Sequence, residues 1–372
     1  MPDSRGQIDK GLLWSLLILV VFGLFMLLSA SGPLGFQRFG DVLYFLKHQV
    51  YFGLLPGLIF FYFFSRLDYR KLIPLAPAAL IGSIVLLLMV YIPGLGMRLG
   101  GSGRWINLGI VTIQPSEFVK IGFLIYVAAW LEKRQEQEET KNIEKGFVPF
   151  LIALSTVIIL LILQPNTGSM VVIAGAALTA YFIAGAPLVW FAGLGVAGAA
   201  LFGFLISVTP YRAARILTFL HPELDPQGIG YHINQAFLAI GSGGLWGLGY
   251  GHSRQKYLYL PEVAGDSIFA VIAEEMGYLV CVMFICLLGY FIYRCFIISK
   301  QASDPFGRLL AVGIGSWIAL QSIFNIASML GLMPITGVTL PFVSYGSSAF
   351  VALSIACGIM ASISKGTYLW RG

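Results

Sequence analysis

Apolar residues along this chain gather in long runs separated by short polar segments. A transmembrane helix needs roughly 20 consecutive apolar residues, and ten runs approach that length. The predicted spans are residues 11–30, 46–64, 73–92, 115–131, 147–164, 169–184, 188–208, 267–293, 308–330 and 345–364. The pattern therefore predicts an all-α, polytopic membrane protein with about ten transmembrane helices.

Two turns divide runs that would otherwise be continuous. One is QPNTG at residues 164–168 and the other is GAP at residues 185–187, and both contain the helix breakers proline and glycine. The first run follows only two basic residues, Arg5 and Lys10, and has no clear cleavage site after it. We therefore expect an uncleaved first span rather than a signal peptide.

The composition excludes a water-soluble fold. Of the 372 residues, 58% are hydrophobic and 11% are charged, whereas soluble domains carry roughly 25% charged residues. We expect one integral membrane domain over residues 1–372, with a large extracytoplasmic loop at residues 209–266. The four cysteines lie in apolar runs without CxxC spacing and are interpreted as packing residues; they are Cys281, Cys286, Cys295 and Cys357.

Lysine and arginine favour one orientation of the spans. With the N-terminus in the cytoplasm, inner segments hold fourteen Lys and Arg residues and outer segments hold eight. This bias predicts that both termini are cytoplasmic, since an even number of spans returns the chain to its starting side. The outer segments keep more positive charge than orientation alone requires, and this excess is a first indication of function.

Two outer segments are long, residues 94–114 and 209–266. Loops of more than about 15 residues are usually functional or disordered, and aromatic and aliphatic residues throughout the longer segment argue against disorder. We expect it to fold back on the membrane surface with short helices near residues 210–220 and 230–241. The inner loop at residues 132–146 has mixed charge and is interpreted as a solvated stretch.

Asp266 ends the longer outer segment, between LPEVAG and the apolar run SIFAVIA. Aspartate is a good helix N-cap, and position alone supports that structural role as well as it supports a catalytic carboxylate at the membrane border. The two roles are compatible, because the start of a helix can face a pocket.

A second group of polar residues begins the span at residues 115–131. Pro115 suits the first helical position, and Gln114, Glu117 and Lys120 recur every three residues on one broad face. Glu117 and Lys120 can form an ion pair at this spacing, which lowers the cost of placing both in a membrane. The pair is either purely structural or part of a functional site.

Basic residues of the outer segments form a third group, which could hold an anionic headgroup through phosphate contacts. The alternative is general attraction to anionic lipid. These residues are Lys47, Arg98, Arg104, Arg212, Arg215, Arg254 and Lys256. The sequence contains no Walker loop, dinucleotide fingerprint, HExxH motif or nucleophile elbow.

Four motifs in order resemble the SEDS family, to which FtsW, RodA and SpoVE belong. They are GSGRWINLGIVTIQPSEFVK, INQAFLAIGSGGLWGLGYGHSRQKYLYLPE, DSIFAVIAEEMG and LPFVSYGSS. The resemblance extends from the first predicted span to the last. The stretch GHSRQKYLYLPE is more similar to FtsW than to RodA.

The resemblance implies a peptidoglycan glycosyltransferase that polymerises lipid II in division or elongation, in the bacterial cytoplasmic membrane. It implies that Asp266 is the general base on the acceptor 4-hydroxyl, which attacks C1 of the donor sugar with inversion. Basic residues would stabilise the leaving pyrophosphate. Positions similar to the family's cavity and signature residues are Trp105, Gln114, Glu117, Lys120, Ser344, Tyr345 and Ser348.

The implied partners are lipid II, membrane lipid and a class B penicillin-binding protein, and no nucleic acid is expected. The chain departs from the family pattern at Ala264-Gly265-Asp266, where HTD is common, and at Ser347 in the signature GGS. Asn166 also replaces an acid, which removes one candidate ligand for a divalent cation. A site with Mg²⁺ or Mn²⁺ and a site without metal both stay open.

Two other functions are compatible with the sequence. A lipid II flippase would need polar residues along a path through both leaflets, and the inner halves of the predicted spans offer few. A membrane scaffold for a penicillin-binding protein would not depend on Asp266.

Overall fold

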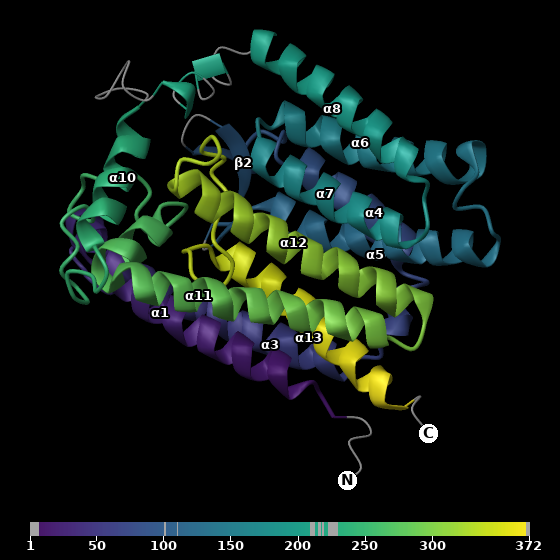
Figure 1. The fold of residues 1–372 in the computed structure, drawn as a ribbon, viewed down its shortest axis with the longest axis horizontal. Helices are drawn as coiled ribbons and strands as arrows, with labels where there is room; N and C mark the ends of the chain where they lie inside the picture. Colours follow the sequence, from purple (N-terminus) through teal and green to yellow (C-terminus); the bar gives the residue numbers. More distant parts are fainter. Residues whose placement is uncertain are drawn as a thin grey trace.

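The computed structural model describes residues 7–99, 102–109, 111–208, 213–214, 217, 219–221 and 230–369. It is a bundle of long helices (Figure 1), so the predicted all-α, polytopic membrane fold is confirmed. Within these residues, seven helical stretches are long and apolar enough to cross a membrane: α1 (Lys10–Phe39), α2 to α3 (Tyr44–Arg66), η3 with α6 (Ile143–Leu163), α8 (Leu188–Val208), α11 (Ile268–Gln301), α12 (Pro305–Met329) and α13 (Ser347–Leu369, apolar to Gly366).

Three further helices coincide with the remaining predicted spans. Helices α4 (Ala76–Met89) and α7 (Thr167–Ile183) are apolar but shorter. Helix α5 (Pro115–Glu136) is long enough, but it contains Glu117 and Lys120 and ends in charged residues. Every predicted run is therefore helical, while the number of ten crossings stays a prediction.

Both predicted turns separate helices. Helix α6 (Val148–Leu163) ends before Pro165, and α7 begins after Asn166, whose side chain accepts a hydrogen bond from the Ser169 amide as an N-cap. At the second turn, α7 ends at Ile183 and α8 begins at Leu188.

Helices α12 and α13 form the centre of the bundle. Helix α13 packs along α3 (Leu55–Arg66), and α12 packs against α5, α7 and α11. The helices α3 and α13 approach closely because Gly358 has no side chain: a Cβ there would lie 2.8 Å from the Phe61 carbonyl oxygen. By contrast, α8 lies at the edge of the bundle (Figure 1) and contacts it through the rings of Trp190 and Phe191 against Tyr181.

The two ends of the bundle differ. At one end, the start of α1 lies beside the end of α13, where the Asp9 amide donates to Ser364 Oγ at 3.1 Å (Figure 1). We call this the terminal end. The opposite end, which we call the loop end, carries α10 (Tyr231–Gly243), a small sheet and the segments at residues 244–266 and 331–346. The predicted helix near 230–241 is thus confirmed, whereas most of the one near 210–220 lies outside the described residues.

A three-stranded antiparallel sheet occupies the segment at residues 94–114, where no strand was expected. Its strands are β1 (Gly96–Leu99), β2 (Ser102–Asn107) and β3 (Thr112–Ile113), in the order β1-β2-β3. The strands are short, and among the side chains of β2 whose burial is described, residues 103–107, only that of Ile106 is buried. A period-2 apolar pattern is too brief here to identify strands from the sequence.

Helix α11 is interrupted at Gly277, which has φ 76° and ψ 178°. Around this break, the backbone of Glu274, Glu275, Tyr278 and Leu279 bonds to residues 244–249. The four bonds are Leu248 N to Glu274 O (2.9 Å), Gly249 N to Glu275 O (3.0 Å), Tyr278 N to Gly244 O (2.9 Å) and Leu279 N to Leu245 O (3.3 Å). A Cβ on Gly277 would lie 2.2 Å from the Gly247 nitrogen, so only glycine permits this contact.

Candidate functional site

Asp266 lies at the loop end, two residues before α11 begins at Ile268. Ser267 rather than Asp266 occupies the N-cap position, so the structural role that position alone had suggested for Asp266 is wrong. The side chain of Asp266 is half-buried. It faces the segment before α13: a Cβ on Gly337 would lie 3.9 Å from Asp266 Oδ2.

Three consecutive carbonyl groups fix the backbone at Asp266. The Ala264 carbonyl accepts from the Tyr345 amide at 2.7 Å, and the Gly265 carbonyl accepts from Ser344 Oγ at 2.6 Å. The carbonyl of Asp266 itself accepts from Asn325 Nδ2 at 2.8 Å. We call these three contacts the Asp266 mount. Two of these bonds come from the segment before α13 and the third comes from α12, so tertiary contacts determine the position of the backbone at Asp266.

The mount also orders the segment at residues 331–346. Asn325 Nδ2 makes a second bond to the Val338 carbonyl at 2.7 Å, and Ser344 Oγ accepts from the Leu340 amide at 2.8 Å. Gln321, one turn before Asn325 on α12, donates to the Thr339 carbonyl at 3.0 Å. These buried side chains satisfy backbone groups of a non-helical segment inside the bundle.

The predicted ion pair on α5 is present. Lys120 Nζ lies 2.9 Å from Glu117 Oε2, and both side chains are almost completely buried. Lys120 also donates to Gln321 Oε1 at 2.7 Å and lies 5.0 Å from the centre of the Trp317 ring. The pair therefore connects α5 to α12 and, through Gln321, to the segment that faces Asp266.

The starts of α5, α7 and α13 meet beside this network. The Gln114 amide donates to Ser348 Oγ at 3.3 Å, which links α5 to α13. Asn166 Nδ2 donates to Ser116 Oγ at 3.0 Å, which links α7 to α5. A Cβ on Gly168 would lie 3.0 Å from the Thr336 carbonyl oxygen, so α7 also touches the segment before α13.

The structure thus brings together six of the predicted site residues around one chain of contacts: Asp266, Gln114, Glu117, Lys120, Ser344 and Ser348. Four helices, α5, α7, α11 and α13, begin at this place. Each helix N-terminus carries roughly half a positive charge on its unsatisfied amides, so their shared direction favours an anion here.

Arg104 and Trp105 lie on β2 and are half-buried. Arg104 donates from Nε to the Gln164 carbonyl at 3.3 Å and from a terminal nitrogen to the Pro165 carbonyl. Arg104 therefore ties the small sheet to the turn between α6 and α7, next to the Asn166 cap.

The other predicted basic residues have different surroundings. Lys47 is exposed and lies 2.8 Å from Asp41, and its hydrogen bond lowers the pKa of that carboxyl below its usual value. The side chain of Arg254 is exposed at the loop end. Arg212 lies outside the described residues.

Lys256 does not fit the predicted contact with substrate. Its side chain is 4% exposed, and Nζ donates to Ser29 Oγ, to the Gly251 carbonyl and to Glu275 Oε1, at 2.8 to 2.9 Å. An ammonium group has three N–H donors, and all three are used inside the protein. Its role is structural in this conformation.

Three polar residues beside Asp266 were not singled out from the sequence. Asn325 and Gln321 are fully buried, and their spacing of four residues in the apolar run at 308–330 was an available signal, since polar groups inside a span are functional candidates. His232 on α10 lies 2.6 Å from Ser267 Oγ, which donates to the Pro261 carbonyl. The hydroxyl proton is thus used, so His232 Nε2 is the donor. Only the fold brings His232 to this place.

Among the residues that the structure describes, no three His, Cys, Asp or Glu side chains gather into a group that could hold a metal ion. Asn166, where the resemblance implies an acid, is bonded to Ser116 and caps α7. The described residues therefore hold no such group beside Asp266.

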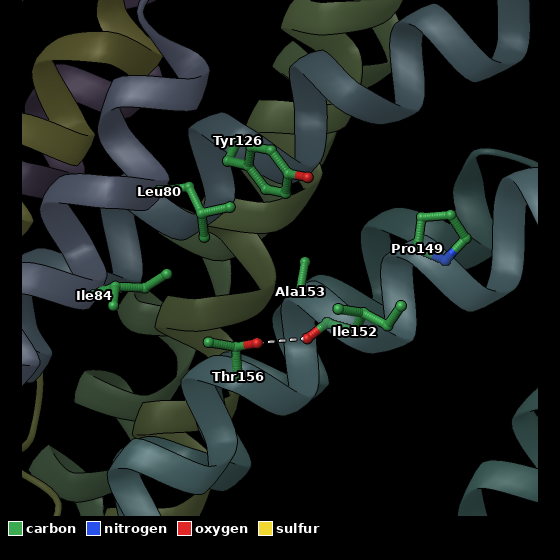
Figure 2. Close-up of a pocket in the computed structure, with 7 residues that line it drawn as sticks. All are labelled: Leu80, Ile84, Tyr126, Pro149, Ile152, Ala153 and Thr156. Atoms are coloured by element: carbon green, nitrogen blue, oxygen red, sulfur yellow. Dashed lines mark hydrogen bonds between the residues drawn. The ribbon is translucent and has the colours of Figure 1, made fainter.

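A separate cavity of about 310 Å³ opens between α4, α5 and α6. Figure 2 shows mainly apolar side chains around it, together with the Tyr126 phenol and the Thr156 hydroxyl, which donates to the Ile152 carbonyl at 2.9 Å. The lining residues are Leu80, Ile84, Tyr126, Pro149, Ile152, Ala153 and Thr156. It contains none of the candidate site residues.

Comparison with known proteins agrees with the predicted resemblance. Residues 10–369 match a family described as cell cycle protein, which is defined by FtsW, RodA and SpoVE. The chain is 37% identical to stage V sporulation protein E of Bacillus subtilis, over 98% of this chain and 99% of that protein. It is also 37% identical to a probable peptidoglycan glycosyltransferase FtsW of Trichlorobacter lovleyi, over 99% and 96%.

A solved structure is similar over nearly the whole fold. It was described as showing the structural coordination of polymerization and crosslinking by a peptidoglycan synthase complex. One of its chains superposes with a TM-score of 0.79 and 25% identity, covering 98% of this chain and 99% of that chain.

Proposed function

Because this chain belongs to the family of FtsW, RodA and SpoVE, we propose that it is a peptidoglycan glycosyltransferase that polymerises lipid II. It is a multi-pass membrane protein, and relatives of about the same length are named as peptidoglycan glycosyltransferases. The substrate and the roles of individual residues are our inference from the site.

The observation that supports this proposal best is the Asp266 mount. Asp266 takes part in it by the bond from Asn325 to its main-chain carbonyl, while its neighbours are bound to Ser344 and Tyr345. A carboxylate that must accept a proton from a substrate hydroxyl needs a fixed position, because small displacements are costly in catalysis. The mount supplies such a position at the end of the bundle.

The reaction follows from this arrangement. Asp266 accepts the proton of the acceptor sugar's 4-hydroxyl while that oxygen forms a bond to C1 of the donor, with inversion. The bond from C1 to the phosphate oxygen breaks at the same time, and the electron pair leaves with undecaprenyl pyrophosphate. The N-termini of α5, α7, α11 and α13 stabilise the growing negative charge through their amides, and Arg104 and Arg254 are candidate cationic contacts.

A lipid II polymerase of this kind works at the outer surface of the bacterial cytoplasmic membrane. We therefore place the loop end outside and both termini in the cytoplasm, as the distribution of Lys and Arg favours. The chain then forms one membrane domain with residues 209–266 on the outer side. A class B penicillin-binding protein is the partner that would crosslink the product, since one similar chain comes from a complex that polymerises and crosslinks.

The test is polymerisation of fluorescent lipid II by the purified chain in detergent. Asp266→Asn keeps the size of the side chain and removes its basicity, so product formation should fall by about 100-fold or more. Asp41→Asn is the matched control, because Asp41 is another aspartate at the loop end, and its carboxylate accepts only from exposed Lys47 and from the Leu43 amide among the bonds seen. The control should polymerise normally.

Wild-type amounts of polymer from Asp266→Ala would refute the proposal and favour a scaffold. Movement of labelled lipid II across liposome membranes without any polymer would instead favour a flippase.

A further inference from the structure

Residues 244–260, which we call the collar, carry large apolar and aromatic side chains that the rest of the protein does not cover. Trp246 is 80% exposed, Leu245 61%, Tyr257 57%, Leu258 52% and Tyr259 57%. Clusters of this kind on a water-facing loop are rare, and they mark a surface that contacts something apolar. The collar follows α10 and lies beside α1 and α11 at the loop end (Figure 1).

The depth of the collar along the bundle follows from two of its hydrogen bonds. Tyr250 Oη donates to the Phe25 carbonyl on α1 at 2.8 Å, and Gly244 O accepts from the Tyr278 amide on α11 at 2.9 Å. The salt bridge between Asp9 and Arg294 gives a common reference level at the terminal end.

Phe25 follows Asp9 by 16 residues, and Tyr278 precedes Arg294 by 16 residues. At 1.5 Å per residue, both contacts lie about 24 Å from the reference level. Measured along α11 from Lys300, six residues beyond Arg294, the contact at Tyr278 lies about 33 Å away. A hydrocarbon layer about 30 Å thick that begins between Arg294 and Lys300 would reach its far boundary at the collar.

Buried carboxylates satisfy the collar's backbone at this depth. Glu274 and Glu275 are each 1% exposed on the outer part of α11. Glu274 accepts from Ser253 Oγ and from the amides of Arg254 and Gln255 at 2.9 and 3.3 Å. Non-helical backbone is tolerated at membrane depth only where protein groups satisfy it. The two acids and the bonds around Gly277 do so here.

Lys256 completes this arrangement. It neutralises Glu275 and bonds to Ser29 of α1, so the collar is fixed between α1 and α11. Its charge lies on the protein side, whereas the apolar side chains lie on the exposed side. Tyr278 and Leu279 are also exposed. They connect the apolar surface of the collar to the apolar surface of α11 that we expect lipid to cover.

We propose that the collar is seated in the outer leaflet, at the boundary between the hydrocarbon and headgroup layers, and that lipid covers Trp246, Tyr257, Leu258 and Tyr259. Tryptophan and tyrosine are enriched at this level because their rings are amphipathic. The collar thus holds the outer part of α11, and the Asp266 mount with it, at a fixed depth relative to the membrane. The depth of the collar, unlike the choice of the outer leaflet, is independent of the proposed enzymatic activity.

The experiment is a depth measurement in proteoliposomes of phosphatidylethanolamine and phosphatidylglycerol, with the chain alone. Single cysteines carrying a nitroxide replace Trp246 or Leu258 in a variant whose four native cysteines are serine. Ile81→Cys, on the lipid side of α4, is the hydrocarbon control, and Lys141→Cys, in an exposed turn of the terminal end, is the water control.

At Trp246 and Leu258, collisions with a water-soluble nickel chelate present on both sides should be about tenfold less frequent than at Lys141, because polar solutes are excluded from hydrocarbon. Collisions with oxygen should approach those at Ile81. Nickel accessibility equal to that at Lys141 would overturn the proposal. Protection that appears only after a penicillin-binding protein is added would also overturn it and identify a protein as the occupant.

A second measurement keeps the native cysteines and needs no label, because it follows tryptophan fluorescence. In liposomes that contain lipid brominated near the glycerol end of the acyl chain, the wild-type fluorescence should include a strongly quenched contribution that Trp246→Phe lacks. Equal fractional quenching of both proteins would overturn the proposal. Lipid II polymerisation by the same samples reports separately on the proposed function, so the two can fail independently.

Discussion

The substitution Lys256→Met removes the only cation that contacts Glu275 among the described residues. The two side chains are 4% and 0% exposed and lie 2.8 Å apart. Without the lysine, the Glu275 carboxylate keeps Ser29 Oγ at 2.7 Å and the Ser253 amide at 3.3 Å but has no opposite charge. Leaving one partner of a buried ion pair uncompensated costs about 3–5 kcal/mol. The free energy of unfolding should fall by this amount.

The double variant Lys256→Met with Glu275→Gln separates charge from packing. Both charges are then gone, and the new amide oxygen can still accept from Ser29 and from the Ser253 backbone. The double variant should therefore lie within about 1–2 kcal/mol of wild type, while each single variant loses more. The structure thus predicts that the two substitutions together destabilise the protein by less than the sum of their separate effects.

The assay is unfolding in mixed micelles titrated with SDS and followed by circular dichroism at pH 7. Lys47→Met is the matched control, because Lys47 lies at the same distance from Asp41 but the two side chains are 54% and 38% exposed; it should unfold like wild type. The reasoning fails if Lys256→Met is no less stable than this control. It also fails if the double variant is as unstable as the two single effects added together.

Three further predictions follow from single residues. Gly277→Ala should abolish most folded protein in size-exclusion profiles, since its Cβ would lie 2.2 Å from Gly247 N at φ 76°, whereas Gly82→Ala, with open space around its Cβ, should not. Asn325→Ser should lower the polymerisation rate at saturating lipid II by about tenfold through loss of the bond to the Asp266 carbonyl; a change confined to the half-saturating concentration would contradict this role. Burial and the bond to Asp304 raise the pKa of Tyr69 to about 12 from 10.0, so the folded state retains a proton that the unfolded chain releases. Stability should therefore fall from pH 10 to about pH 12, and Tyr69→Phe should remove that part of the fall in SDS titrations.

Hydrophobic runs and helix breakers were sufficient to predict the helices. Each predicted span is helical, and the turns at residues 164–168 and 185–187 divide helices as expected. The ion pair between Glu117 and Lys120 was also predictable, because residues three apart on a helix face each other whatever surrounds them. These are local properties, which depend on neighbours in the sequence.

The missed features depend on contacts between residues far apart in the sequence. The break at Gly277 exists because residues 244–249 approach α11 there, and nothing in the pattern of the apolar run at 267–293 indicates it. Likewise, Lys256 was grouped with the basic residues that could meet a substrate, because sequence cannot show that Glu275 and Ser29 surround it. In the sequence, a basic residue of an outer segment cannot be assigned to substrate contact or to a buried ion pair.

The polar residues at the loop end contribute different groups to the hydrogen bonds that hold the fold. Gln321 and Lys256 use their side chains to bind backbone carbonyls of non-helical segments. Asp266 contributes to the fold through its main-chain carbonyl, which Asn325 binds. A substitution of the Asp266 side chain leaves that bond in place, so the mount should survive in Asp266→Asn. A loss of polymerisation in that variant would therefore not come from loss of the mount, whereas the same loss in Lys256→Met would report on structure.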